Sequence, residues 1–378
     1  MKVLVVMPGL NGQGGAEQSF AATAPWLMEH GVTLDLALFT DRRMLVPTVE
    51  AMGVTVHDLS SASGARGRAA ALRALVERLQ PDLVHATLYE AEVPTLLASR
   101  RTKVPSLVTW ATTTQTSTSE GGVASWKLKV VEATQTVLGR FAGAKYQAVT
   151  QGVADSRGST LKVPAARIRV AERGRDASKF APRSPDELAV VRSDLGLVDG
   201  DRLVLSVARL EPAKGLERLL ALVDDLVDAV PGAVVAIAGR DGSAGNRLRD
   251  QASGLRHADR VKFLGHRDDV PALLQVADCW VCTSHREGAA GAMLESWASG
   301  CPVVTVPVDG IVGVAEDGHN ALVAEPAALA GAVARVLTDD ELTARLVEHG
   351  RADFAARFTV ERSAEQLLDV YRWAAGQP

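Results

Sequence analysis

The sequence has few cysteines. Among its 378 residues there are only three, which are too few for a disulfide framework. Two of them, Cys279 and Cys282, form a C-x-x-C pattern inside ADCWVCTS, which is typical of a buried strand. Because residues three apart on a strand point to opposite faces, the pair is poorly placed to share a metal ion or a disulfide. We interpret both cysteines as core residues, since the sequence offers no second pair for zinc.

Other absences exclude several classes of function. The net charge is −4, without the basic excess of most nucleic-acid-binding proteins. No apolar run is long enough to span a bilayer, and the N-terminal MKVLVVMPG leads into glycines rather than a signal-peptide cleavage site. The signatures G-x-S-x-G, H-E-x-x-H and G-x-x-x-x-G-K-S/T of common hydrolases, zinc proteases and P-loop enzymes are also missing. We therefore expect a cytoplasmic protein that does not bind nucleic acid.

Length and composition favour two α/β domains. An apolar fraction of 47% in 378 residues is enough for two cores. Strand-like runs such as KVLVVMP, TLDLALFT and PDLVHATL alternate with helix-like segments, and a second series begins at RLVLSVARL. Residues 178–200 have two prolines and mixed charge, and we expect the domain boundary there. The alternation predicts doubly wound parallel sheets that bind ligands at the carboxyl ends of their strands, with a cleft between the domains.

One helix-like segment has features of a membrane-surface helix. It is WKLKVVEATQTVLGRFAGA, with Lys127 and Lys129 near its start. Contact with an anionic membrane is possible for such a helix, but we favour a helix that faces the core.

The stretch Ser284–Pro307, SHREGAAGAMLESWASGCPVVTVP, has the features of an anion-binding loop. Glu287 precedes the four small residues Gly288–Gly291, and Glu295 follows eight positions after Glu287 on a predicted helix. Small residues before a helix let a ligand approach the backbone, whose unpaired N–H groups attract an anion. The pattern predicts a strand–loop–helix site for a nucleoside diphosphate. An ordinary α/β loop with solvated acids is the alternative.

Candidate charged residues follow two other predicted strands. Arg209 and Lys214, in SVARLEPAKGLERLL, lie where an open sheet binds ligands, and two fixed cations there would neutralise a diphosphate. His85, in LVHATLY, ends a strand of the first domain and is a candidate catalytic residue, with a structural histidine as the alternative. Asp199 and Asp201 form the only D-x-D, but they precede a strand in a turn, so we predict no metal site.

A glycine-rich loop follows the first predicted strand and contains Gly14 and Gly15. A loop between a strand and a helix is the context in which a phosphate or substrate binds. The spacing does not fit G-x-G-x-x-G, because Glu17 occupies the position of the third glycine. The alternatives are an NAD site with Asp41 as ribose ligand, and a glycine-rich loop without phosphate contact.

Together these segments resemble the GT-B glycosyltransferases, specifically the retaining group called glycosyltransferase family 4. The resemblance covers nearly the whole chain and is carried by GGAE at Gly14–Glu17, the PDLVHA strand, VARLEPAKG, VKFLGHRDDVPALLQVADCWVCTSHREG, and the E-x7-E pattern from Glu287 to Glu295 with SGCPVV after it. It implies an α/β, GT-B fold: two Rossmann-like doubly wound parallel-sheet domains facing across a cleft. Residues 1–180, with a last helix at about 360–378, would bind the acceptor, and residues 181–359 would bind the nucleotide sugar.

The resemblance also implies roles for single residues. Arg209 and Lys214 would hold the diphosphate together with backbone amides near Gly291. Glu295 would accept ribose hydroxyls, and Glu287 would touch the donor sugar. The other donor-binding candidates are Gly14, Gly15, Gly265, His266, Arg267, Gly288, Ala290, Ala292 and Leu294.

The activity that we expect is that of a metal-independent, retaining glycosyltransferase. It would transfer a sugar from a nucleoside-diphosphate sugar, most commonly a UDP-sugar and alternatively a GDP-sugar, to a hydroxyl acceptor such as a glycan, a lipid intermediate or a small secondary metabolite. The nucleotide sugar is the co-substrate, and no further cofactor is expected. The alternatives are a non-hydrolysing UDP-sugar 2-epimerase and a catalytically silent nucleotide-sugar-binding protein.

Three positions depart from the family's pattern. Trp110 or a neighbour stands where many relatives have a histidine that contacts the donor sugar. The family's N-G-V-D appears here as Arg173–Asp176, RGRD, and its G-G-x-P-E loop as Asp309–Gly313, DGIVG, without the glutamate. These changes suggest an unusual donor or acceptor, or a weakened activity.

Overall fold

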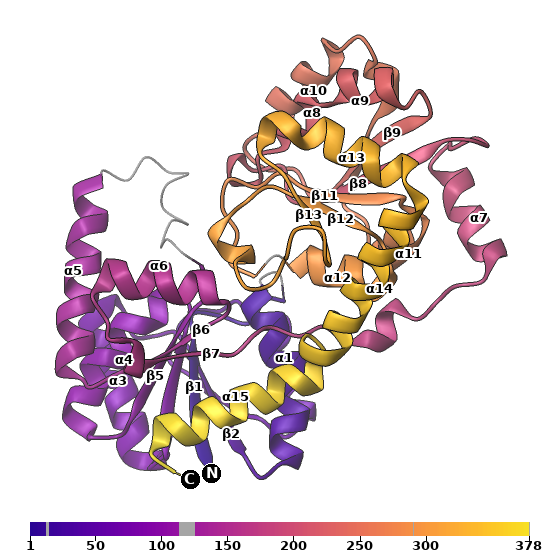
Figure 1. The fold of residues 1–378 in the computed structure, drawn as a ribbon. Helices are drawn as coiled ribbons and strands as arrows, with labels where there is room; N and C mark the ends of the chain where they lie inside the picture. The colour runs from indigo at the N-terminus through magenta and orange to yellow at the C-terminus, as the bar shows by residue number, and fades with distance from the viewer. Residues whose placement is uncertain (13–14, 113–124, 290, 378) are drawn as a thin grey trace. The chain divides into compact units, whose positions relative to one another are not determined.

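The computed structural model describes residues 1–12, 15–112, 125–289 and 291–377. The chain divides into two compact units, which we call unit 1 (Met1–Gly174 and Val360–Pro378) and unit 2 (Arg175–Thr359). Each unit is an α/β structure built on its own sheet (Figure 1).

Unit 1 is built on a parallel sheet. Within the described residues the sheet has seven strands in the order β3-β2-β1-β4-β5-β6-β7. The strands are β1 (Lys2–Met7), β2 (Thr33–Leu38), β3 (Thr55–Asp58), β4 (Leu83–Thr87), β5 (Ser106–Trp110), β6 (Lys145–Ala148) and β7 (Ile168–Val170). The central strand β1 is fully buried from Val3 to Met7. Helices on both faces of a doubly wound sheet explain this burial and the unbroken apolar run in the sequence.

Helices from both ends of the chain cover one face of the unit 1 sheet. The helices of unit 1 are α1 (Gly15–Glu29), α2 (Val46–Ala51), α3 (Gly64–Leu79), α4 (Tyr89–Thr102), α5 (Ser125–Phe141), α6 (Gln151–Leu161), η2 (Ala165–Arg167) and α15 (Val360–Ala375). The first and last of these, α1 and α15, pack against each other, and Phe20, Leu27 and Tyr371 share one core with β1 (Figure 1). The last helix therefore completes the core of the first unit.

Unit 2 has a parallel sheet of the same kind. Its described strands run in the order β10-β9-β8-β11-β12-β13. They are β8 (Arg202–Val207), β9 (Ala233–Ala238), β10 (Val261–Gly265), β11 (Cys279–Cys282), β12 (Val303–Thr305) and β13 (Leu322–Val323). The helices are η3 (Ala177–Phe180), α7 (Pro185–Asp194), η4 (Pro212–Lys214), α8 (Leu216–Ala221), α9 (Val223–Ala229), α10 (Gly245–Ser253), η5 (Ala258–Arg260), α11 (Val270–Val276), α12 (Gly291–Ser299), η6 (Asp309–Ile311), η7 (Pro326–Ala328), α13 (Leu329–Thr338) and α14 (Asp340–Arg357).

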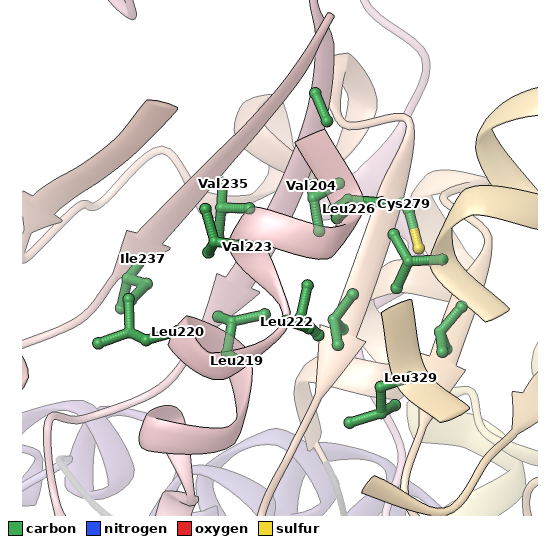
Figure 2. Close-up of a cluster of buried hydrophobic side chains, with 14 of the residues drawn as sticks. Val204, Leu219, Leu220, Leu222, Val223, Leu226, Val235, Ile237, Cys279 and Leu329 are labelled. Atoms are coloured by element: carbon green, nitrogen blue, oxygen red, sulfur yellow. The ribbon is translucent and has the colours of Figure 1, made fainter. Parts of the chain in front are cut away.

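The unit 2 sheet separates two apolar clusters. In one cluster, side chains of α8, α9 and α13 pack on one face of the sheet, where α13 contacts β11 and β12; Figure 2 shows Leu219, Val223 and Leu329 of this cluster. The other cluster contains residues of α11 and α12. Cys279 belongs to the first cluster and Cys282 to the second, and burial raises the pKa of both thiols. The prediction that these cysteines are core residues on opposite faces of a strand is confirmed.

The division between the units falls slightly before the expected boundary after residue 180. The backbone N–H of Arg175 donates to the Phe358 carbonyl oxygen at 2.8 Å, and η3, with Phe180 buried, packs against α11 and α12. Residues 175–180 therefore belong to unit 2. Among the described helices, none combines the length and the apolar character needed to cross a membrane.

Candidate functional site

A pocket of about 130 Å³ lies at the carboxyl ends of β8 and β11 in unit 2. Its walls come from the ends of these strands, from η4, from the loop after β11 and from the first turn of α12. The lining residues are Ser206, Val207, Ala208, Lys214, Trp280, Cys282, Thr283, Ser284, Glu287, Gly291 and Ala292. The carboxyl edge of an open parallel sheet is where such folds bind ligands.

An ion pair stands at this pocket. Lys214 Nζ donates to Glu287 Oε1 at 2.7 Å, and Ser284 Oγ donates to the same oxygen at 2.5 Å. The Lys214 side chain is 27% exposed and that of Glu287 is 12% exposed, so the pair is accessible without being fully solvated. Among the described residues, Glu287 Oε2 has no hydrogen-bond partner. The pocket thus presents a cation and a carboxylate oxygen that can accept from a ligand.

The loop that carries Glu287 is held by close backbone contacts. Gly215 has φ +58°, and a Cβ there would lie 2.1 Å from the Thr283 carbonyl oxygen. Thr283 Oγ1 donates to the Lys214 carbonyl oxygen at 3.3 Å, and the backbone N–H of His285 donates to the Ala213 carbonyl oxygen at 2.9 Å. Because glycine alone allows both the positive φ and the close approach, the loop after β11 is fixed against η4.

The segment Asp309–Gly313, which departs from the family's pattern, supports the same loop from another side. A Cβ at Gly310 would lie 2.2 Å from the Glu287 carbonyl oxygen, and Ile311 is buried in the core. This segment therefore positions the backbone of Glu287.

Only some of the predicted donor-binding residues meet at the pocket. Lys214, Glu287, Gly291 and Ala292 line it, whereas Arg209 and Gly288 do not. The Arg209 side chain is exposed and makes no hydrogen bond or ion pair with any described residue. Ala290 lies outside the described residues.

Leu294 does not line the pocket, and its contact with the donor stays a prediction. Its side chain is 2% exposed and belongs to the core cluster behind α12. Because α12 is amphipathic in this way, a donor can contact Leu294 only through its backbone.

Glu295, the second carboxylate of the E-x7-E pattern, is paired with Arg175. Arg175 Nε donates to Glu295 Oε1 at 2.7 Å. The Nη2 atom of Arg175 lies 1.9 Å from the position that a Cβ on Gly291 would occupy. The small residue at the start of α12 therefore leaves room for an arginine of the RGRD segment.

The segment Gly265–Arg267 lies away from the pocket within unit 2. It begins with the last residue of β10, which is separated from β8 by β9 in the sheet. Arg267 donates to both carboxylate oxygens of Asp269, at 2.8 and 2.7 Å, and to Asp194 at 3.1 Å. The hydrogen bonds to Asp269 raise the pKa of Arg267 above its usual range. His266 Nε2 is 3.2 Å from Asp268 Oδ1, so a ligand would have to compete with acidic partners here.

His85 is buried in unit 1. It is 4% exposed, its Nδ1 accepts from Tyr371 Oη at 2.9 Å, and its Nε2 lies 2.6 Å from Thr109 Oγ1. Because Thr109 Oγ1 donates to Gln147 Oε1 at 2.5 Å, the histidine Nε2–H must be the donor to Thr109. Burial lowers the pKa of His85 to about 3. These contacts favour the structural alternative for His85 over a catalytic role.

The other candidates of unit 1 lie at the start of α1 and the end of β5. Gly14 lies outside the described residues. Gly15 begins α1, and a Cβ there would lie 3.0 Å from Arg173 Nη1. Trp110 is 3% exposed and stacks on Tyr146 with ring centroids 4.4 Å apart. Trp110, which itself or through a neighbour takes the place of the usual sugar-contacting histidine, is thus part of the core.

Two family models match the chain. The model described as "Glycosyl transferases group 1" matches residues 190–353, and the model described as "Glycosyl transferase 4-like domain" matches residues 14–174. One model therefore falls in each unit. The chain belongs to glycosyltransferase family 4.

Alignments with known relatives cover almost the whole length of this family 4 glycosyltransferase. The D-inositol 3-phosphate glycosyltransferase of Salinispora arenicola is 28% identical, with 96% of this chain and 88% of that protein aligned. Anabaena Alr3699/HepE in complex with UDP has a TM-score of 0.81 at 23% identity, over 98% of this chain and 99% of that chain. Its complex with UDP-glucose has a TM-score of 0.80 at 22% identity, over 97% and 98%. The predicted GT-B fold of two Rossmann-like domains is confirmed, as is the enzyme class.

Two contacts of this glycosyltransferase were not predicted from its sequence. Ser284 is the first residue of the stretch Ser284–Pro307, but only the conformation of the loop brings its hydroxyl to Glu287. Arg175 is marked in the sequence by its departure from N-G-V-D, although nothing local indicates a contact with Glu295, 120 positions away.

The D-x-D residue Asp201 accepts from the Val198 N–H at 2.9 Å and from Arg260 at 3.0 Å, as a turn residue does.

Proposed function

We propose that this glycosyltransferase binds a nucleoside-diphosphate sugar at the unit 2 pocket and transfers the sugar to a hydroxyl acceptor. The observation that carries the proposal is the Lys214–Glu287 pair at the carboxyl edge of the sheet, beside the start of α12. The UDP and UDP-glucose complexes of the similarly folded Anabaena protein support a UDP-sugar as the donor.

The proposed chemistry follows from the charges at the pocket. Cleavage of the sugar–phosphate bond builds negative charge on the departing diphosphate. Lys214 would stabilise this charge as it forms, and the backbone N–H groups at the start of α12 would add to the effect. Glu287 Oε1 already receives Lys214 and Ser284, so Oε2 is the oxygen that would accept a hydroxyl of the donor sugar.

We further propose retention of the anomeric configuration and independence from metal ions. Retention is supported by the resemblance to the family. The acceptor would attack on the face that the diphosphate leaves, and its proton would pass to the leaving phosphate oxygen. Lys214 supplies a cation for the diphosphate without a metal, so excess EDTA is expected to leave the transfer rate unchanged. Loss of activity on chelation that Mn²⁺ or Mg²⁺ restores would contradict metal independence.

The acceptor carries a hydroxyl group, and its class stays open in this proposal. The Salinispora relative's name specifies an inositol phosphate for that protein. A small phosphorylated polyol is accordingly one acceptor to test beside glycans, lipid intermediates and secondary metabolites.

A panel of nucleotide sugars tests the proposal. Thermal unfolding is measured with UDP- and GDP-sugars, and a ligand present at about 100 times its Kd should add about 2.7 kcal/mol to the unfolding free energy. The donor that raises the melting temperature is then incubated with and without candidate acceptors, and the products are identified. No shift with any nucleotide sugar would contradict the donor site. An epimerised sugar released without an acceptor would contradict transfer.

A further inference from the structure

Arg175 is fixed at the first position of unit 2. Its backbone N–H donates to the Phe358 carbonyl oxygen at 2.8 Å, and it forms a parallel bridge with Thr359. Its side chain is 17% exposed, and that of Glu295 is 23% exposed. The guanidinium group therefore approaches α12 from a backbone position that is itself anchored.

The contact with Glu295 uses one oxygen only. Arg175 Nε donates to Glu295 Oε1 at 2.7 Å, and Glu295 Oε2 has no partner among the described residues. The guanidinium group also occupies the space beside Gly291, which lines the unit 2 pocket. Next to the pocket wall, Arg175 thus holds one oxygen of a carboxylate whose other oxygen has no partner in the part of the chain that the structure describes.

We propose that Arg175 is a positioning residue for the donor site: it fixes Glu295 through Oε1, so that Oε2 alone accepts a hydroxyl of the donor's ribose. The inference rests on the proposed function. A glutamate on the first turns of a helix can adopt several rotamers, and an arginine partner restricts them before the ligand arrives. With a single accepting oxygen, the site should bind a ribonucleotide more tightly than the deoxynucleotide that lacks the hydroxyl at one position of the ring.

Binding of ribose and deoxyribose nucleotides tests this role. UDP and GDP are titrated into the full chain by calorimetry, followed by the 2′-deoxy and 3′-deoxy forms of the tighter one. The wild type should prefer the ribonucleotide over one of its two deoxy forms. In Arg175→Met this preference should fall by about tenfold, the effect of losing one good charge-assisted hydrogen bond, with the affinity for that deoxy form unchanged. Arg175→Lys should retain part of the preference.

Arg260→Met is the matched control. It removes a partly buried arginine of unit 2 that pairs with Asp201 at 3.0 Å, and neither residue lines the pocket. Its affinities for all three nucleotides should equal those of the wild type. The melting temperature of each variant shows whether it is folded, and Arg175→Lys carries the test alone if Arg175→Met does not fold.

The outcomes separate the two proposals. If the wild type binds neither UDP nor GDP, the proposed function fails and this inference fails with it. If the wild type binds one of these ribonucleotides but has the same affinity for its two deoxy forms, the inference alone is overturned. It is also overturned if Arg175→Met binds all forms as the wild type does, or loses affinity for all of them equally, because the arginine would then act on the diphosphate or on the fold.

Discussion

The two units have the same architecture but differ in how the polar residues on or beyond their strands are used. In unit 1, His85, Thr109 and Gln147 come from β4, β5 and β6. They line a pocket of about 60 Å³ and form a hydrogen-bonded chain that ends on the Ala171 carbonyl oxygen. In unit 2, Lys214 at the end of η4 and Glu287 in the loop after β11 meet at a pocket of about 130 Å³, and Glu287 Oε2 has no hydrogen-bond partner among the described residues. Polarity near the end of a strand is therefore not enough to mark a site. What distinguishes the unit 2 residues is that their hydrogen-bonding capacity is only partly used.

The largest expected effect is that of breaking the unit 2 pair. Glu287→Gln keeps the shape of the side chain but removes the charge that holds Lys214, so the transfer rate should fall by a factor on the order of 10² with little change in melting temperature. The rate is measured with the donor found in the panel. Glu316→Gln, an exposed glutamate of the same unit, is the control and should keep the wild-type rate. A wild-type rate in Glu287→Gln would show that the Lys214–Glu287 pair is not needed for transfer, and the two units would then not differ in the way described above.

Gly310→Ala tests whether the loop conformation makes the site. The added Cβ would meet the Glu287 carbonyl oxygen at 2.2 Å, so the loop must shift. We expect weaker binding of the nucleotide sugar and a loss of about 1–3 kcal/mol of unfolding free energy, which is typical of overpacking. Gly331→Ala, in α13 with nothing within 4 Å of its Cβ, is the control and should be neutral or slightly stabilising. Unchanged binding in Gly310→Ala would show that this contact does not position Glu287.

His85→Gln examines unit 1 in the same way. The amide cannot reproduce both imidazole contacts, so Tyr371 or Thr109 loses a buried partner, and unfolding should become easier by about 1–3 kcal/mol. Denaturant unfolding and nucleotide titration measure the two properties separately. Nucleotide affinity should be unchanged. A large loss of transfer rate at unchanged stability would instead restore His85 to the catalytic residues.

Acid should weaken the fold partly through His85. Its pKa is about 3 when folded, against about 6.5 in an unfolded chain, so between these values the unfolded state binds more protons. Stability from this group is complete above about pH 6.5 and is lost as the pH falls toward 3. Glu92, whose pKa burial raises to about 7, acts in the opposite direction in wild type and variant alike. Unfolding at pH 7 and pH 5 should therefore show a smaller acid loss in His85→Gln than in the wild type, and an equal loss would contradict the assignment.

The sequence predicts the sheets well but some helices poorly. Apolar runs such as Val3–Met7 identify buried strands because both faces of the sheet are covered. The segment predicted as a boundary contains α7, which begins with a capping box between Ser184 and Glu187. The segment lacks an apolar stripe because no residue of α7 is buried. Helix α6 is difficult to predict for another reason. Thr150 caps it by accepting from the Val153 N–H, but its glycines and serines conceal the helical pattern.

The candidate site divides in the same way. Lys214 and Glu287 are predictable because each follows a strand within a recognisable motif. The pairing of Arg175 with Glu295 depends on the path of a chain that brings together residues far apart in sequence, and no local pattern specifies it. His85 shows the converse, since its position at a strand predicts a site, whereas its contacts favour the structural alternative.

The most direct test is the affinity of the unit 2 pocket for a diphosphate. UDP and uridine are titrated into the wild type, Lys214→Met and Lys262→Met, the last being a lysine of β10 that does not line the pocket. If Lys214 binds the diphosphate, the wild type and Lys262→Met should prefer UDP strongly over uridine, and Lys214→Met should lose about tenfold or more of that preference while binding uridine unchanged. Equal preference for UDP in Lys214→Met and the wild type would contradict the account.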